Sequence, residues 1–519
     1  MEKNINELRI IVEKAKENGN WYRLGRVFHT TKCFYFLDTG TGKVYKISKN
    51  TYRVLDCLFK TNNFDNLYKI NISKQELYLA LREICDAIKG QHLFSAPPLS
   101  KQNIIDRHLN LEKHLQNEMN SITLELTEKC NLRCKYCVYG KTNENYRTFG
   151  EKVMSLETAR KGIDFLMEHS KEDEKVYIGF YGGEPLLRFP IIKEIILYIR
   201  SNYSHRKVFY SMTSNMTLMT DEIAKFLANV EDMSVVASID GPKEIHDNQR
   251  VFIDGRGTFE KAIKGLETYM RYKKASVNKD KPFAISTVLM EPYDKKKFDA
   301  LNDFFGELRK KYSFSILISY VSHTSPSVEY VEINDRDENK WSNNEEPEKI
   351  YDPLMAWTMN NLNEDVFTNN YFRRAGLIEI HMRNISDLPI ETYSLNGCCV
   401  PGSRRLYVTA DGEFLPCERI GTQLPIGNVN SGFDIDFIRK NYVEDFIEQE
   451  IRFCGECWAI NMCKNCYMNC FGDNVIDFSH RHIMCENSRK RLTEALSIYH
   501  EILEKRPEFI EQLNDVIIE

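Results

Sequence analysis

The segment Cys130-Asn-Leu-Arg-Cys134-Lys-Tyr-Cys137 follows a short apolar run, ITLEL, at residues 122–126. Three thiolates on one short loop can bind three irons of a [4Fe–4S] cluster and leave the fourth iron without a protein ligand. A zinc site is the alternative, but structural zinc takes four protein ligands, and neither a histidine nor a fourth cysteine stands at ligand spacing nearby. The spacing therefore favours an iron–sulfur cluster over zinc.

Five more apolar runs follow this loop, separated by amphipathic stretches with helical spacing. This alternation is typical of βαβ units, which build a parallel sheet covered by helices. Such sheets bind ligands at the carboxyl ends of their strands, and the cysteine loop stands at such an end. The six runs are ITLEL (122–126), KVYIGFY (175–181), VFYSMTS (208–214), MSVVASID (233–240), FAISTVLM (283–290) and FSILISYV (314–321).

Length and composition indicate a soluble chain of several domains. The 519 residues exceed the usual size of one domain. A net charge of -5 gives no electrostatic reason to expect nucleic acid or a membrane as a partner. The first residues lack the apolar core of a signal peptide, and no apolar run approaches membrane-spanning length, so we expect a cytoplasmic protein.

The 15 cysteines are unevenly distributed. Cys33, Cys57 and Cys85 are scattered and are interpreted as buried apolar residues. Nine others lie between Cys398 and Cys485. In a reducing compartment, dense and closely spaced cysteines favour metal or cluster ligation over disulfides.

The first cysteine loop, with an aromatic residue before its last cysteine, resembles the CxxxCxΦC motif of the radical S-adenosylmethionine (SAM) superfamily. The resemblance implies that Cys130, Cys134 and Cys137 bind a [4Fe–4S] cluster whose open iron is chelated by the amino and carboxylate groups of SAM. An electron from the cluster then cleaves SAM to methionine and a 5′-deoxyadenosyl radical, which abstracts hydrogen from a substrate. Tyr136 would pack near the adenine. The implied α/β fold is a partial parallel (β/α)6 barrel over residues 121–321.

Four further segments match this superfamily in the expected order: GGEP, TSN, SIDGP and HDNQR. By the resemblance, GGEP receives the ammonium of SAM, serine and acidic positions contact its ribose, and the arginine faces its carboxylate. Taken singly, each segment has a structural alternative, such as an ordinary turn or a surface arginine. The predicted SAM-binding residues, besides Tyr136, are Gly182, Gly183, Glu184, Ser214, Asn215, Ser238, Asp240 and Arg250.

The C-terminal cysteines resemble the SPASM extension, which binds two auxiliary [4Fe–4S] clusters in many peptide-modifying radical SAM enzymes. Two places depart from its pattern, since Cys398 competes with Cys399 and Cys466 competes with Cys470. A pair of zinc-ribbon sites is the alternative. The resemblance implies one auxiliary cluster on Cys398 or Cys399, Cys417, and Cys466 or Cys470, and another on Cys454, Cys457, Cys463 and Cys485.

Glu418 follows Cys417 directly. In sulfatase-maturating relatives an acidic residue at the matching place is a proposed base, so the resemblance implies that Glu418 accepts a substrate proton. The alternative is that this carboxylate caps backbone amides.

Near the N-terminus, FHTTKCFYFLD and KVYKIS flank the turn-prone TGTG, which predicts a β-hairpin between residues 26 and 48. Helices are expected after Ser48 and after Ser73, which has capping-box spacing to Glu76. This order resembles the winged-helix-like domain with which peptide maturases bind a leader peptide as an added strand. A winged helix that binds DNA or only supports the barrel is the alternative. Net acidity and the lack of a basic recognition helix disfavour DNA.

Together these interpretations predict an enzyme that installs thioether crosslinks between cysteine and an acceptor carbon of a ribosomally synthesised peptide. Its partners would be a precursor peptide with a leader and a cysteine-containing core, and an electron donor such as flavodoxin or ferredoxin. Alternatives are carbon–carbon crosslinking, epimerisation, oxidation of a sulfatase residue, or a non-catalytic iron–sulfur scaffold. The expected domains are 1–95 (leader recognition), 96–120 (linker), 121–321 (barrel), 322–395 (polar insertion and helical bridge), 396–490 (SPASM) and 491–519 (C-terminal helix).

Overall fold

The computed structural model of the chain describes residues 6, 9–10, 21–105, 110–137, 139–140, 148–290, 294–321, 376–394, 399–420, 424–466 and 478–515. Cys398, Cys470 and most of the predicted polar segment at 322–395 lie outside these ranges. Among the helices within them, none combines the length and the apolar character that a membrane span requires.

A 10-stranded sheet organises the larger part of the molecule, in the order β13-β12-β11-β10-β4-β5-β6-β7-β8-β9. From β4 to β9, neighbouring strands follow one another in the sequence and pair in parallel. They coincide with the six apolar runs, so the predicted parallel sheet is confirmed. Their bounds are β4 Ser121–Glu125, β5 Val176–Tyr181, β6 Val208–Ser214, β7 Met233–Ser238, β8 Ala284–Met290 and β9 Ser315–Val321.

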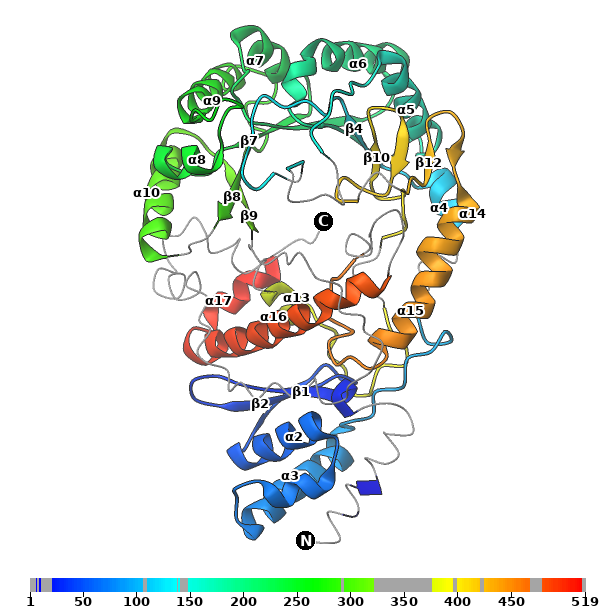
Figure 1. Cartoon of the computed structure of the whole chain (residues 1–519), viewed down its shortest axis with the longest axis vertical. Coiled ribbons are helices and arrows are strands. Elements are labelled where there is room, and N and C mark those ends of the chain that lie inside the picture. The colour runs from blue at the N-terminus through cyan, green and yellow to red at the C-terminus, as the bar shows by residue number, and fades with distance from the viewer. Residues whose placement is uncertain are drawn as a thin grey trace.

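Helices between these strands cover the outer face of the sheet, where Figure 1 shows them as an arc. Ser155, Thr220 and Asp294 start three of them, because each side chain accepts a hydrogen bond from an amide of the first turn. The apolar sides of the helices and the strands share one large core. The helix bounds are α4 Leu111–Asn117, α5 Leu156–Glu168, α6 Phe189–Asn202, α7 Asp221–Ala228, α8 Lys243–Gln249, α9 Phe259–Lys273 and α10 Lys295–Lys311.

Four short C-terminal strands extend the sheet beyond β4. The first pairs in parallel with β4, with Leu406 opposite Ile122, and the others continue in antiparallel fashion. None was predicted, because strands this short show no readable alternation of apolar and polar residues. Their bounds are β10 Leu406–Val408, β11 Glu413–Leu415, β12 Gly427–Asn428 and β13 Gly432–Phe433.

Five further α-helices of the described residues belong to the C-terminal part of the sequence, from residue 377 onwards. The longest, α16, lies between the large sheet and the N-terminal unit in Figure 1, and the boundary predicted between 490 and 491 falls inside it. A π-helical turn, Arg439–Glu444, joins α14 to α15. The bounds are α13 Leu377–His381, α14 Ile435–Ile438, α15 Asp445–Cys454, α16 Phe478–Lys505 and α17 Glu508–Glu511.

The N-terminal unit is a separate antiparallel sheet with its own apolar core. Its strands are β1 Gly25–His29, β2 Phe34–Asp38 and β3 Val44–Ile47, followed by α2 Lys49–Thr61 and α3 Lys74–Gln91. The predicted hairpin was incomplete, because Thr30 and Cys33 close a turn that divides FHTTKCFYFLD into two strands. The capping box of Ser73 and Glu76 is confirmed.

Candidate functional site

The loop 130–137 leaves the carboxyl end of β4 and is fixed to a segment more than a hundred residues later in the chain. The amide of Arg133 donates to the carbonyl of Val251 at 2.8 Å, and the amide of Lys135 donates to that of Gln249 at 3.0 Å. Both bonds flank Arg250. The fold therefore brings the first cysteine motif and the HDNQR segment together.

The thiols of Cys130, Cys134 and Cys137 converge within this loop. Burial raises the pKa of Cys130 to about 12, and the nearby thiolates of the other two add to that rise. Among the described side chains, no three His, Cys, Asp or Glu residues have the close spacing of a single-ion site. A cluster of several irons spans a wider gap between thiolates, and iron can replace the protons that burial now favours. Three thiols on one loop fit a [4Fe–4S] cluster that keeps one iron for another ligand.

The paired glycines of GGEP pack against the chain itself. Gly182 has φ +128°, and a Cβ atom there would lie 2.3 Å from the carbonyl oxygen of Thr127. A Cβ on Gly183 would lie 2.1 Å from the carbonyl oxygen of Lys129. A side chain at either glycine would thus displace the backbone that leads into Cys130. The two glycines therefore allow the GGEP turn to pack directly against the backbone that precedes Cys130.

Glu184 is buried, 1% exposed, and its carboxylate accepts three hydrogen bonds. The Ser214 hydroxyl donates to Oε1 at 2.8 Å, and the amides of Asn215 and Leu186 donate at 2.8 and 3.1 Å. Burial raises the pKa of Glu184, and these donors oppose the rise. An ionised carboxylate has about four acceptor positions, so one remains for a ligand.

Two more predicted positions lie at the ends of β6 and β7. The side-chain amide of Asn215 donates to Asn131 of the cysteine loop at 3.0 Å. Ser238 ends β7 and is buried. The ends of β4, β5, β6 and β7 thus contribute to one region.

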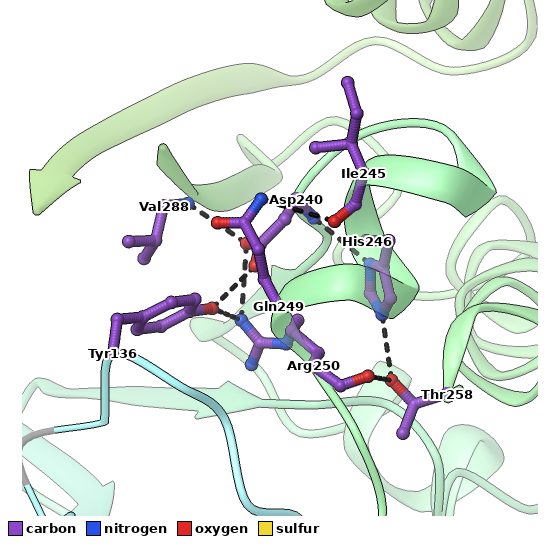
Figure 2. Close-up of polar contacts among 8 residues, drawn as sticks. All are labelled: Tyr136, Asp240, Ile245, His246, Gln249, Arg250, Thr258 and Val288. Atoms are coloured by element: carbon purple, nitrogen blue, oxygen red, sulfur yellow. Dashed lines mark hydrogen bonds and ion pairs between the residues drawn. The ribbon is translucent and has the colours of Figure 1, made fainter. Parts of the chain in front are cut away.

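Figure 2 shows a buried network at the end of β7. The Tyr136 hydroxyl donates to Asp240 Oδ2 at 2.7 Å and accepts from the Arg250 guanidinium. Arg250 also pairs with Asp240 Oδ1 at 3.4 Å, and the amide of Val288 donates to the same oxygen at 3.0 Å. Burial raises the pKa of Asp240, and the guanidinium opposes the rise. The network connects Tyr136, predicted as an adenine neighbour, to two other predicted SAM-binding residues.

Two polar atoms of this network are buried without a hydrogen-bond partner in the described part of the chain: Nε of Arg250 and Oε1 of Gln249. A buried donor that is left unpaired costs about 1–3 kcal/mol. An anionic group would satisfy Nε, and a carboxylate matches the guanidinium geometry. Arg250 therefore fits the carboxylate of SAM.

Three members of this network were not among the predicted SAM-binding residues: Gln249, His246 and Thr258. Asp240 donates its backbone N–H to His246 Nδ1 at 3.2 Å, so Nε2 carries the proton and donates to Thr258 Oγ1 at 3.0 Å. The Thr258 hydroxyl then donates to the Arg250 carbonyl at 2.9 Å. This series of hydrogen bonds joins the backbones of Asp240 and Arg250. The only sequence signal was that His246 and Gln249 belong to the HDNQR segment.

The C-terminal cysteines form two groups. Cys454, Cys457, Cys463 and Cys485 line one cavity. In the other group, burial raises the pKa of Cys417 to about 11, and the thiolates of Cys399 and Cys466 add to the rise. The second group contains Cys399, Cys417 and Cys466, while the alternatives Cys398 and Cys470 lie outside the described residues.

Glu418, beside Cys417, forms ion pairs through Oε1 with Arg405 at 3.1 Å and with Arg419 at 3.9 Å. Its side chain is 23% exposed. The carboxylate is thus partly accessible and held by cations.

Residues 124–302 match the model of the radical SAM superfamily. The cysteine-type anaerobic sulfatase-maturating enzyme of Clostridium novyi is 26% identical over 385 residues, which are 72% of this chain and 93% of that enzyme. The radical SAM cyclopropyl synthase TigE of Paramaledivibacter caminithermalis is 26% identical over 275 residues, 49% of this chain and 52% of that protein.

Among solved structures, native anSMEcpe with bound AdoMet and Cp18Cys peptide superposes with a TM-score of 0.50 and 20% identity, covering 76% of this chain and 99% of that one. This likeness concerns the fold. The superfamily match over residues 124–302, together with this likeness of fold, shows that the chain contains a radical SAM domain.

Proposed function

We propose that the chain is a radical SAM enzyme that modifies a ribosomally made peptide, with a thioether as the product. One observation carries the proposal: Cys130, Cys134 and Cys137 converge next to Arg250, whose Nε is buried without a partner in the described part of the chain. A three-cysteine cluster site and an unsatisfied cation together fit a cofactor that has both iron-chelating groups and a carboxylate.

The residues of the first site would divide the work of binding SAM. The three cysteines would hold a [4Fe–4S] cluster, which supplies the electron for cleavage of SAM to methionine and a 5′-deoxyadenosyl radical. Arg250 would bind the carboxylate through Nε, with Asp240 and Tyr136 fixing its plane. Glu184 would offer its remaining acceptor position to the ammonium. A flavodoxin or ferredoxin would deliver the electron.

The two groups of C-terminal cysteines would bind auxiliary clusters. Cys454, Cys457, Cys463 and Cys485 supply four thiols to one cavity, the number that a complete [4Fe–4S] site uses. Cys399, Cys417 and Cys466 supply three in the described residues. An iron of this site without a protein ligand would hold the thiolate of a substrate cysteine, which is what thioether formation needs.

The N-terminal unit would hold the leader of the substrate. β3 pairs with β2 on one side, and within the described residues no strand pairs with its other side, where a leader strand would be added. The relatives agree with a peptide or protein as substrate, since one is a sulfatase-maturating enzyme and the related solved structure contains a peptide.

The first test is the production of 5′-deoxyadenosine by reduced, anaerobically reconstituted protein with SAM. We expect formation above background, and its loss in Arg250→Ala. A fully loaded protein that makes none would contradict the enzyme proposal and favour an iron–sulfur scaffold.

The second test is anaerobic coexpression with short cysteine-containing peptides encoded beside the gene, followed by tandem mass spectrometry. A thioether removes two hydrogens for each crosslink, whereas epimerisation leaves the mass unchanged. Glu418→Gln should lower the yield of modified peptide by about 100-fold if Glu418 is the base, with 5′-deoxyadenosine formation retained. An unchanged yield would leave Glu418 with its ion pairs as a structural role.

A further inference from the structure

Arg489 lines the same cavity as Cys454, Cys457, Cys463 and Cys485. It lies on α16, one helical turn after Cys485, so its side chain points to the same side of that helix. Its guanidinium forms a hydrogen bond with the Cys457 thiol. The cavity is thus built around a cation.

The opposite side of Arg489 faces the N-terminal unit. Its guanidinium carbon lies 5.9 Å from the centre of the Tyr22 ring, within the range of a cation–π contact. The Tyr22 hydroxyl accepts a hydrogen bond at 2.9 Å from the indole N–H of Trp458, the residue after Cys457. Tyr22 therefore touches both the cation and the loop of cysteines.

Further bonds join the same loop to the N-terminal unit. The Thr39 hydroxyl donates to the Trp458 carbonyl at 3.2 Å, and the Asn461 side-chain amide donates to the Thr39 carbonyl at 3.1 Å. Trp458 is 1% exposed, and the Arg26 guanidinium lies 5.9 Å from its ring centre. The loop between Cys457 and Cys463 thus packs against the N-terminal unit, at Tyr22 before β1, at Arg26 in β1 and at Thr39 after β2.

We propose that Arg489 is a positioning residue that raises the reduction potential of a cluster bound by Cys454, Cys457, Cys463 and Cys485, and that Tyr22 links this control to the N-terminal unit. The inference rests on the proposed function, because it requires a cluster in this cavity. Reduction adds one electron to an already anionic group of iron, sulfide and thiolates. A buried cation and a hydrogen bond to a ligand sulfur both stabilise the extra charge.

The experiment is an EPR-monitored redox titration of the full chain in a Cys130→Ala/Cys134→Ala/Cys137→Ala background, which removes the signal of the first site. The cluster of Cys399, Cys417 and Cys466 then serves as an internal reference. Arg489→Gln should lower the ratio of reduced to oxidised cluster about tenfold at a fixed potential. This change corresponds to a decrease of about 59 mV in the reduction potential of a one-electron couple. Arg489→Lys, which keeps the charge without the planar fork, should lower it less.

Two further variants separate the effect of Arg489 from a general loss of charge. Lys490→Gln removes one positive charge from the adjacent exposed position of α16 and should leave the ratio unchanged. Tyr22→Ala should lower it about threefold, the size of a weak cation–π contribution. If Arg489→Gln fails to retain iron, Arg489→Lys and Tyr22→Ala make the same comparison.

Iron and sulfide content distinguishes the two ways of failing. If Cys454→Ala in the same background leaves the iron content unchanged, no cluster occupies the cavity, and the auxiliary-cluster proposal falls together with this inference. A cluster that is present but has the same potential in Arg489→Gln as in the parent overturns the role of Arg489 alone.

Discussion

The loop with Cys130, Cys134 and Cys137 lies against a network of buried polar and charged side chains, whereas the cavity of Cys454, Cys457, Cys463 and Cys485 is enclosed in part by Phe453, Ala459 and Ile460. The first site includes a buried donor without a partner in the described residues, and that donor is available to a polar ligand. In the second site, four thiols can complete a cluster without help from a ligand. The contrast agrees with the proposed division between a first site that binds SAM beside its cluster and a second site that encloses its cluster.

The largest expected effect tests this contrast directly. Cys134→Ala should lower 5′-deoxyadenosine formation by more than about 100-fold, beyond the usual cost of losing an outer-shell partner. Cys457→Ala should retain SAM cleavage while losing iron from the second cavity. The measurement is product formation per bound iron. Equal losses of cleavage in both variants would remove the distinction between the sites.

The next effect concerns the buried charges of the first site. Asp240→Asn leaves the Arg250 guanidinium buried without its anion, which should lower the free energy of unfolding by about 3–5 kcal/mol. The measurement is urea unfolding under anaerobic conditions. Glu244→Gln, at an exposed position of α8, is the matched control and should unfold like the parent. If Asp240→Asn lowers the free energy of unfolding by less than about 1 kcal/mol, the ion pair between Asp240 and Arg250 does not stabilise the fold as expected.

A smaller effect depends on pH. Burial lowers the pKa of His246 from 6.5 to about 3, and Arg250 contributes to the shift. Below pH 6.5 the unfolded chain binds a proton that the folded chain does not, so stability is lost as the pH falls from 6.5 towards 3. Between pH 7 and pH 5 the loss should be about 2 kcal/mol.

The measurement compares unfolding of the parent and of His246→Gln at both pH values. The variant should show a smaller decrease on acidification. His500, whose pKa burial lowers to about 4, remains in both proteins and contributes equally. Identical pH dependence in the two would mean that His246 is not held neutral by the network of Figure 2.

The smallest expected effect concerns the second site. Thr39→Val removes the hydrogen bond to the Trp458 carbonyl and should cost about 1 kcal/mol of unfolding free energy. Thr31→Val, whose hydroxyl bonds to Glu501 at a more exposed position, is the control for loss of a threonine hydroxyl. If Thr39→Val unfolds like the parent, the loop of Trp458 does not depend on the N-terminal unit for its stability.

The central sheet was predictable because each strand is encoded locally, as an apolar run between helical stretches. The extension of that sheet was not, since β10 has three residues and is defined by pairing Leu406 with Ile122, far apart in the sequence. The same holds within the site. Cys130, Cys134 and Cys137 form one contiguous motif, whereas Thr258 acquires its role only when the fold brings it to His246 and Arg250.

The grouping of the C-terminal cysteines also depends on the fold. Cys399, Cys417 and Cys466 come from three separate segments, and only the folded chain brings them near one another. Cys398 and Cys470 lie outside the described residues, so the predicted alternatives at these two positions stay open.

The position of α16 has a consequence for how the molecule is assembled. Its first half contributes Cys485 and Arg489 to the second cavity, and its last turns contribute Glu504, which accepts hydrogen bonds from Thr30 at 2.8 Å and Tyr35 at 2.7 Å. Ribosomes synthesise this helix long after β1 and β2 and after the other three cysteines of the cavity. The proposed binding of iron at that cavity and the packing of the N-terminal sheet on α16 therefore both require the same late segment, so a nascent chain that stalls before α16 lacks both.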